Sequence, residues 1–342
     1  MSDWFALTTR GLEFISEREL ARLPHVADLE RGYRHVLFSY RGTAALLLEL
    51  RTVDDLFVHV ATWDGIARPR STLEQLRRLG GLLDLEVGVA MCSSVRQIPV
   101  RPAFSVTASF VGKRNYTTDE IKAAVAEGIE AEHGWPYQPN DGAANLNVRL
   151  FIEHDLALVG LRLGSAALHE RPYKRVHLAG SLKPPVAAAL VAMAELRPGD
   201  RVVDPCCGVG TIPIEAALIG AVAQGGDRDV EALNGARANA AAAGVAVRFQ
   251  QWDAQALPLA VGAADCCISN LPWGRQVVVD ADLALFYQRS LTEMRRILVP
   301  DGRIIVLTST PELLQAHGLA CENQFEISLF GQTPVIAQLR ML

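Results

Sequence analysis

The sequence has no apolar run long enough to cross a bilayer and no targeting pattern at its N-terminus. Its longest apolar candidate, PPVAAALVAMAEL, falls well short of the roughly 20 residues that a membrane-spanning helix requires. The first residues, MSDWFALTTRGLEF, lack a basic start followed by a continuous apolar stretch, so they do not resemble a secretory signal. We therefore expect a cytoplasmic protein that contacts no membrane.

The sequence also lacks the cysteine spacing of a metal site. No two of its six cysteines form a C-x-x-C pair, and vicinal cysteines rarely suit a disulfide or a zinc ion. We expect no bound metal and six small, buried thiols. The cysteines are Cys92, Cys206, Cys207, Cys266, Cys267 and Cys321.

An excess of positive charge is absent as well. Lys and Arg number 33 against 38 Asp and Glu, the formal net charge is −5, and neither half of the chain is basic. A nucleic-acid partner would therefore be held by local basic patches and not by a uniformly positive surface. Each patch alone is more often a solvated face, but together they could neutralise several phosphates. The candidates lie in RPRSTLEQLRR, VGKRNY and HERPYKR and are Arg68, Arg70, Arg77, Arg78, Lys113, Arg114, Arg171, Lys174 and Arg175.

The length of 342 residues is enough for two or three domains. Residues 1–62 alternate as strand, helix, strand, strand, helix and strand, an order that predicts a ferredoxin-like domain. Residues 63–168 contain further helices and alternating strands, which predict a second small α/β domain. In this domain we expect Thr118 to cap the helix that opens at TTDEIKAAVAEG.

After a linker over residues 169–184, the pattern changes to strands that alternate with glycine turns and helices. This order predicts a doubly wound, mostly parallel sheet, whose ligands bind at the carboxyl ends of the strands. The tail FEISLFGQTPVIAQLRML contains two strands around a Gly-Gln-Thr-Pro turn, which predicts an antiparallel hairpin at the sheet edge. The fold class is therefore α/β, with a Rossmann-like domain over residues 185–342.

A glycine turn follows the first strand of that domain, in VVDPCCGVGTIPIEAA. The strand ends at Asp204, the turn contains Gly208 and Gly210, and Thr211 opens a helix. The third glycine of a nicotinamide-binding loop is replaced by Pro213, and no phosphate-binding G-K-[ST] is present. On its own such a turn is a weak signal, because many similar turns have no ligand.

Polar residues at the ends of the next strands strengthen the signal. Asp227 follows the second strand, where a carboxylate can accept both hydroxyls of a ribose. Asp253 follows the third strand and could accept a hydrogen bond from an adenine amine, and Asn270 follows the fourth. Taken singly, each is more often a helix cap or a turn residue. With Asp204 they predict a ligand site on one edge of the sheet.

The motifs DPxCGxGT, GGD, WDA and NLPW, in this order, resemble the class I S-adenosylmethionine-dependent methyltransferases that methylate amines. More narrowly, RGLE, GKRNYTTDEI and ALHERPYKRVHLAGSLKPPVAAAL resemble the THUMP-domain RNA methyltransferases, and among them the tRNA guanine-N2 group. The resemblance implies an N-terminal ferredoxin-like domain over 1–62, a THUMP RNA-binding domain over 63–168, the linker, and the methyltransferase domain over 185–342. The basic candidates above, together with Arg275, would then bind RNA.

The resemblance also implies roles at the site. The Asn270 side-chain oxygen and the Leu271 carbonyl would accept hydrogen bonds from the target amine, Pro272 would shape the turn, and Trp273 would stack on the base. The usual second and fourth residues of this loop are Pro and Tyr or Phe, so Leu271 and Trp273 weaken any inference about which base fits. Cofactor binding is assigned to Asp204, Cys206, Gly208, Gly210, Thr211, Asp227, Arg228, Asp253, Ala254 and Asn270.

We therefore expect a monomeric methyltransferase that uses S-adenosylmethionine to methylate the N2 amine of a guanosine in tRNA. The base must be unpaired or flipped out for its amine to be reached. One alternative is a methyltransferase for ribosomal RNA or for another nucleobase amine. An alternative of a different class is a catalytically silent RNA-binding scaffold, which would bind RNA but not the cofactor.

Overall fold

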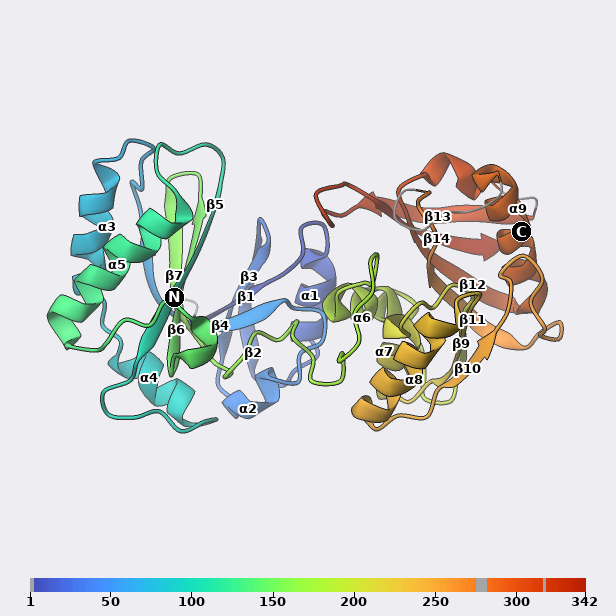
Figure 1. Cartoon of the computed structure of the whole chain (residues 1–342), viewed down its shortest axis with the longest axis horizontal. Coiled ribbons are helices and arrows are strands. Elements are labelled where there is room, and N and C mark those ends of the chain that lie inside the picture. The colour runs from blue at the N-terminus through green and yellow to red at the C-terminus, as the bar shows by residue number, and fades with distance from the viewer. Residues whose placement is uncertain (1–2, 275–281, 316–317) are drawn as a thin grey trace. The chain divides into compact units, whose positions relative to one another are not determined.

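The computed structural model describes residues 3–274, 282–315 and 318–342. The chain divides into two compact units (Figure 1). The N-terminal unit comprises Met1–Thr8 and Ser16–Leu168, and the C-terminal unit comprises Thr9–Ile15 and His169–Leu342. Each unit is built on one seven-stranded sheet. In the described part of the chain, no helix has the length and apolar character needed to span a membrane.

The N-terminal unit begins with the β-α-β-β-α-β order that the sequence predicts. Its first four strands pair antiparallel in the order β2-β3-β1-β4, which is the ferredoxin-like arrangement. The elements are β1 (Trp4–Leu7), α1 (Glu13–Leu20), β2 (Val26–Gly32), β3 (His35–Tyr40), α2 (Ala44–Leu47) and β4 (Asp55–Trp63).

Three more strands extend the same sheet to β2-β3-β1-β4-β7-β6-β5. Strand β7 pairs antiparallel with β4 and β6, and β5 pairs parallel with β6. One sheet therefore contains strands from both of the expected N-terminal domains, 1–62 and 63–168. The domain boundary at residue 62 stays a prediction. The elements are α3 (Thr72–Gly81), α4 (Glu86–Ser93), β5 (Phe104–Val111), α5 (Thr118–His133), the 3₁₀ helix η1 (Asp141–Ala143), β6 (Leu146–Glu153) and β7 (Leu156–Arg162).

Helices α3 and α5 lie side by side over one face of this sheet (Figure 1). Glycine permits their close approach, since a Cβ on Gly128 would lie 2.0 Å from the Arg77 carbonyl oxygen.

The N-terminal cap of α5 is Thr117 and not Thr118 as expected. The Glu120 amide donates to Thr117 Oγ1 (3.2 Å), and the Thr117 amide donates to the Glu120 carboxylate (2.8 Å), which is a capping box.

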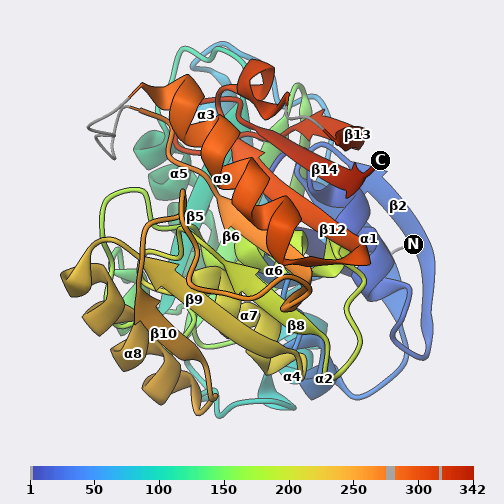
Figure 2. The same ribbon diagram turned by 90° about the vertical axis from the view of Figure 1, so that its right-hand side faces the viewer.

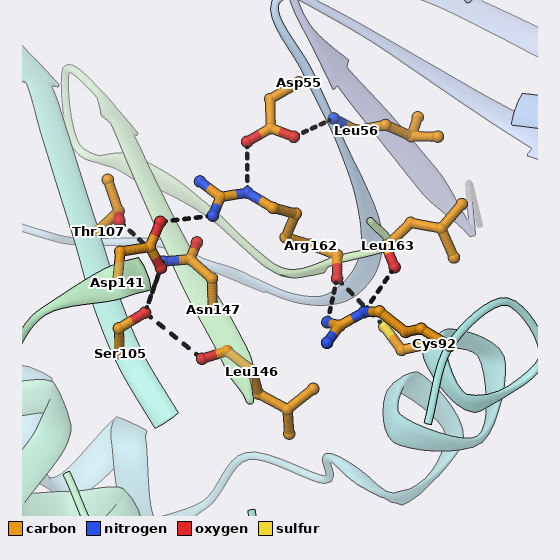
Figure 3. Close-up of polar contacts among 11 residues, drawn as sticks. Asp55, Leu56, Cys92, Ser105, Thr107, Asp141, Leu146, Asn147, Arg162 and Leu163 are labelled. Carbon is orange, nitrogen blue, oxygen red and sulfur yellow. Dashed lines mark hydrogen bonds and ion pairs between the residues drawn. The ribbon is translucent and has the colours of Figure 1, made fainter. Parts of the chain in front are cut away.

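A partly buried ion network joins β4, β7 and η1 in the N-terminal unit (Figure 3). Arg162 Nε donates to Asp55 Oδ2 (2.7 Å), and Arg162 Nη1 donates to Asp141 Oδ2 (2.5 Å). The Asp141 carboxylate also accepts from Ser105 Oγ (2.5 Å) and Asn147 Nδ2 (2.7 Å). Burial raises the pKa of Asp55, although Arg162 acts in the opposite direction. The network therefore holds strands from both halves of the sheet in one geometry.

The C-terminal unit has the sheet order β10-β9-β8-β11-β12-β14-β13. The first five strands are parallel, and β14 is antiparallel to both β12 and β13, so the predicted parallel sheet with a terminal hairpin is confirmed. The elements are α6 (Pro184–Met193), β8 (Arg201–Asp204), α7 (Thr211–Leu218), β9 (Val222–Asp227), α8 (Val230–Ala243), β10 (Arg248–Gln251), β11 (Ala264–Asn270), α9 (Leu283–Ile297), β12 (Leu298–Thr308), the 3₁₀ helix η2 (Pro311–Leu314), β13 (Leu319–Glu326) and β14 (Val335–Met341).

The central strands of this sheet are buried on both faces, which explains their continuous apolar sequences. Consecutive residues of one strand pack on opposite faces of the sheet. Val202 and Cys266 pack with α6 and α7, whereas Val203 and Cys267 pack with α9. Helix α9 lies over β12 (Figure 2). Cys266 and Cys267 therefore lie on opposite faces of the sheet.

The prediction of six buried thiols is corrected at two positions, because Cys321 is exposed and Cys206 is half-buried.

Candidate active site

The carboxyl ends of β8, β9, β10 and β11 surround a cavity of about 1090 Å³. The reason is the strand order: four adjacent parallel strands place their ends on one edge of the sheet. The structure brings twelve of the thirteen expected cofactor and catalytic residues to the cavity wall. They are Asp204, Cys206, Gly208, Thr211, Asp227, Arg228, Asp253, Ala254, Asn270, Leu271, Pro272 and Trp273.

Gly210 is the expected residue that does not line the cavity. Its φ is +80°, and a Cβ there would lie 2.9 Å from the Phe249 ring and 3.0 Å from the Ala236 Cβ. Gly210 is therefore needed for the turn and for helix packing, and its expected contact with the cofactor stays a prediction. Gly208 differs, because a Cβ built on it meets no described atom within 4 Å. A ligand can approach the backbone at Gly208.

The Asp227 carboxylate is held by two backbone amides. Gly208 N donates to Asp227 Oδ2 (2.9 Å), and Asp229 N donates to Asp227 Oδ1 (3.0 Å). Asp229 in turn caps α8 by accepting a hydrogen bond from the Glu231 amide (2.9 Å). Each oxygen of Asp227 retains a lone pair, so this orientation permits hydrogen bonds to two neighbouring hydroxyls.

At the end of β10, Trp252 forms part of the cavity wall. Its Nε1 donates to the Pro205 carbonyl (3.0 Å), and a Cβ on Gly226 would lie 2.0 Å from its ring. Glycine is therefore required at position 226 to let the indole lie flat against β9. The carboxylate of the next residue, Asp253, accepts from the Gln255 amide (2.9 Å). These contacts place Asp253 and Ala254 at the same edge as Asp227.

Asp204 links the ends of β8 and β11. Its side chain is only 2 % exposed, and its Oδ1 accepts from Ser269 Oγ (2.7 Å) and from the Cys206 amide (3.1 Å). Burial raises the pKa of Asp204 to about 7, and the nearby Asp227 carboxylate acts in the same direction. The sequence-based predictions missed Ser269, which is fully buried and lies next to Asn270.

The loop after β11 is anchored by two hydrogen bonds to other elements. Leu271 is fully buried, and its amide donates to the Leu307 carbonyl (3.1 Å). Tyr287 in α9 donates its hydroxyl to the Pro272 carbonyl (3.0 Å), and the same hydroxyl lies 2.6 Å from Thr308 Oγ1. Tyr287 and Thr308 carry no local motif, so only the packing of α9 against β12 identifies them.

Two polar atoms in this loop are buried without a hydrogen-bond partner among the described residues. They are Asn270 Oδ1 and Trp273 Nε1. Buried polar atoms are usually satisfied, so each needs an explanation. Both residues line the cavity, and a bound ligand with a donor amine would satisfy the Asn270 oxygen.

The segment over residues 169–184, expected as a linker, belongs to the C-terminal unit, and residues 178–182 form a wall of the cavity. Asn239 of α8 holds it: its Oδ1 accepts from the amides of Arg175 (3.0 Å) and Val176 (2.9 Å). Its Nδ2 donates to the carbonyls of Val176 and Val209, both at 3.1 Å. Asn239 therefore joins this segment to the glycine turn.

Lys174 does not belong to a basic surface patch, which corrects its expected RNA contact. It is 8 % exposed, and its ammonium donates to the Leu182 carbonyl. Burial lowers the pKa of Lys174 to about 8, and Glu215 acts in the opposite direction. Tyr173 donates its hydroxyl to the same Glu215 (2.6 Å). Lys174 thus holds the wall formed by residues 178–182 in place.

Arg114 is half-buried and bound to other groups of the fold, so its expected RNA contact stays a prediction. Its guanidinium donates to the carbonyls of Ile66 (2.8 Å) and His154 and to the Tyr116 hydroxyl (2.9 Å). Arg70 is exposed but pairs with Glu120. Arg171 is half-buried, and Arg275 lies outside the described residues. Arg77 is likewise exposed but pairs with Glu74. The exposed basic candidates that remain are Arg68, Arg78, Lys113 and Arg175.

The fold and the cavity define a class I methyltransferase: a parallel sheet with a terminal antiparallel pair, a glycine turn after its first strand, and polar residues at the next three strand ends. Residues 171–327 match the family model described as RMKL-like, methyltransferase domain. The tRNA (guanine(6)-N2)-methyltransferase of Thermus thermophilus is 34 % identical over 321 residues, covering 91 % of each chain.

Solved structures show the same relationship. The crystal structure of TrmN from Thermus thermophilus is 28 % identical, covers 99 % of each chain and has a TM-score of 0.81. The putative methyltransferase SMU.472, crystallised with SAH, shares the fold, with 18 % identity, a TM-score of 0.73 and coverage of 100 % of this chain and 98 % of that one. The chain belongs to the family of S-adenosylmethionine-dependent tRNA guanine-N2-methyltransferases. The predicted methyltransferase family is thereby confirmed, whereas the THUMP domain stays a prediction.

Proposed function

We propose that this chain methylates the N2 amine of the guanine at position 6 of tRNA, with S-adenosylmethionine as the methyl donor. The observation that carries the proposal is the buried Asn270 side-chain oxygen, which has no hydrogen-bond partner among the described residues and belongs to a residue that lines the cavity with the glycine turn. The position follows the printed name of the Thermus thermophilus relative. The same cavity and family membership argue against a silent scaffold.

The residues present fit the cofactor. The open space at Gly208 admits a ligand against the backbone, and the Asp227 carboxylate is oriented to accept from a ribose. Asp253 and Ala254 would lie beside the adenine. The carboxylates of Asp227 and Asp253 make the wall electronegative, which favours a ligand that carries positive charge.

The exocyclic amine of guanine is a weak nucleophile, because its lone pair is delocalised into the ring. Asn270 Oδ1 and the Leu271 carbonyl would accept its two hydrogens and so direct the lone pair toward the methyl group. When bound, S-adenosylmethionine supplies a methyl group on a sulfonium, which is a good leaving group. In such a transfer the N2–CH₃ bond would form as the S–CH₃ bond breaks, and the amine would release one proton to solvent. Alignment by this loop therefore contributes most of the acceleration.

We further propose that residues 63–168 form a THUMP domain that binds the tRNA, and that the enzyme works as a cytoplasmic monomer. The exposed Arg68, Lys113 and Arg175 would contact phosphates. Binding should then weaken as salt is raised. A guanine in a helical stem must leave its stack to reach the cavity, which costs a few kcal/mol.

The proposal is tested by incubating the protein with labelled S-adenosylmethionine and total RNA, and by identifying the methylated nucleoside by mass spectrometry. N2-methylguanosine in the tRNA fraction, absent when position 6 of a transcript is changed to adenosine, is the expected result. N2-methylguanosine in ribosomal RNA, or another methylated base, would contradict it. RNA binding without measurable affinity for the cofactor would instead indicate a scaffold.

The matched variant is Asn270→Ala. It should retain the Kd for S-adenosylmethionine and lose about 100-fold or more in turnover, a loss typical of removing one hydrogen-bonding group that acts on the reacting atoms. A variant with near-normal turnover would refute the role of Asn270.

A further inference from the structure

The turn between β13 and β14 carries an aromatic side chain to the active-site cavity. The backbones of Leu329 and Gln332 exchange both hydrogen bonds, each of 3.0 Å, so Phe330 and Gly331 are the central residues of a two-residue turn. Both have positive φ, +53° and +72°, as in a type I′ turn. Asn, Asp and Gly are the residues usual at the first central position, and a bulky aromatic there is rare.

The Phe330 side chain contributes little to the core. It is 44 % exposed, whereas its neighbours Leu329 and Ile327 are almost fully buried and hold the turn in place. Phe330 and Gln332 both line the cavity that contains Asn270. An unfavourable backbone conformation that orients an exposed aromatic ring toward a cavity calls for a functional explanation.

The turn adjoins the substrate end of the cavity. Leu329 and Ile327 belong to the same hydrophobic cluster against which Trp273 packs. The turn that carries Phe330 is thus supported by the same hydrophobic cluster as Trp273 of the target-amine loop, and both aromatic residues line the cavity.

We propose that Phe330 is a second aromatic contact for the target guanine, which stacks on it and on Trp273 after leaving the RNA helix. The inference rests on the proposed function. A flat base presents two π-faces, and stacking on an aromatic side chain is sequence-tolerant and favourable for each base. The ring would therefore stabilise the flipped-out base while Asn270 binds its amine.

Three variants separate this role from the stability of the turn. Phe330→Asn suits the positive φ but removes the ring, Phe330→Tyr keeps the ring, and Glu195→Asn changes another exposed residue of positive φ (+48°) that does not line the cavity. For each we would measure the melting temperature, the Kd for S-adenosylmethionine and the single-turnover rate of methyl transfer to tRNA.

Phe330→Asn should melt no lower than the unmodified protein, bind the cofactor equally well, and transfer the methyl group about 5- to 100-fold more slowly, the loss of one stacked base. Phe330→Tyr and Glu195→Asn should transfer it within about two-fold of the normal rate. A normal rate for Phe330→Asn, or a loss explained by weaker cofactor binding, would overturn the inference. If the unmodified protein itself forms no N2-methylguanosine, the proposed function fails first, so the two failures are distinguishable.

Discussion

Asp204 offers a sensitive test of the site, because it is a fully enclosed carboxylate next to the reacting loop. Replacement by Asn keeps the shape and an oxygen that can accept from Ser269 Oγ and the Cys206 amide, and it removes only the charge. Burial raises the pKa of Asp204 from 3.8 to about 7. The native state therefore keeps this proton over a pH range in which the unfolded chain has lost it.

The sign of the effect follows from linkage. The contribution of Asp204 to stability is fully present below about pH 4 and is lost as the pH rises through about 7. The pKa difference of about three pH units, at about 1.4 kcal/mol each, corresponds to a full penalty of about 4 kcal/mol above pH 7. Between pH 5 and pH 8 the stability of Asp204→Asn relative to the unmodified protein should rise by about 2.5 kcal/mol.

The assay is thermal unfolding of both proteins without cofactor at several pH values. The difference in melting temperature should grow by roughly 5–10 °C between pH 5 and pH 8, with Asp204→Asn the more stable at high pH. Comparing the two proteins at each pH cancels the titration of all other groups. A constant difference across this range would refute the reasoning, because it would mean that Asp204 is ionised in the folded protein throughout.

Tyr287→Phe removes the hydroxyl that donates to the Pro272 carbonyl, so the single-turnover rate should fall while the Kd for S-adenosylmethionine is unchanged. Its control is Tyr40→Phe, which removes a hydroxyl that donates to a backbone carbonyl in the N-terminal unit and should lower the stability by only about 1 kcal/mol. Equal rates for the two variants would contradict a positioning role of Tyr287. Lys174→Met should leave the salt dependence of tRNA binding unaltered, because its ammonium is buried, whereas Lys113→Met should reduce the slope by about one phosphate contact. Filter binding at several salt concentrations measures both slopes, and a similar reduction in Lys174→Met would show that this lysine does contact RNA.

The charged residues show where reasoning from the sequence was insufficient. Arg114 lies next to Lys113 in one basic segment and Lys174 lies in another, yet of the three only Lys113 is exposed. The Lys174 ammonium donates to the Leu182 carbonyl, and the Arg114 guanidinium donates to the carbonyls of Ile66 and His154. Such partners cannot be recognised from local charge, since burial of a cation depends on which backbone groups the fold brings to it.

The residues that support the site were missed for the same reason. Ser269, Tyr287 and Asn239 each bind a group on another element, and none stands in a local motif. Phe330 was missed because its type I′ turn lacks the usual Asn-Gly signal. The glycine turn was recognised, but its two glycines could not be told apart: packing against Phe249 and Ala236 distinguishes Gly210 from Gly208.

The sequence by itself determined the succession of strands and helices, the parallel sheet with its terminal hairpin, and the polar residues that end four strands. These features depend on local periodicity and turn chemistry, which short stretches of chain contain in full. Tertiary structure alone decided which lysine is buried, which hydroxyl anchors the Asn270 loop, and that the Asn270 oxygen lacks a partner among the described residues. Hydrogen-bond satisfaction and burial depend on atoms that meet only when distant segments pack together.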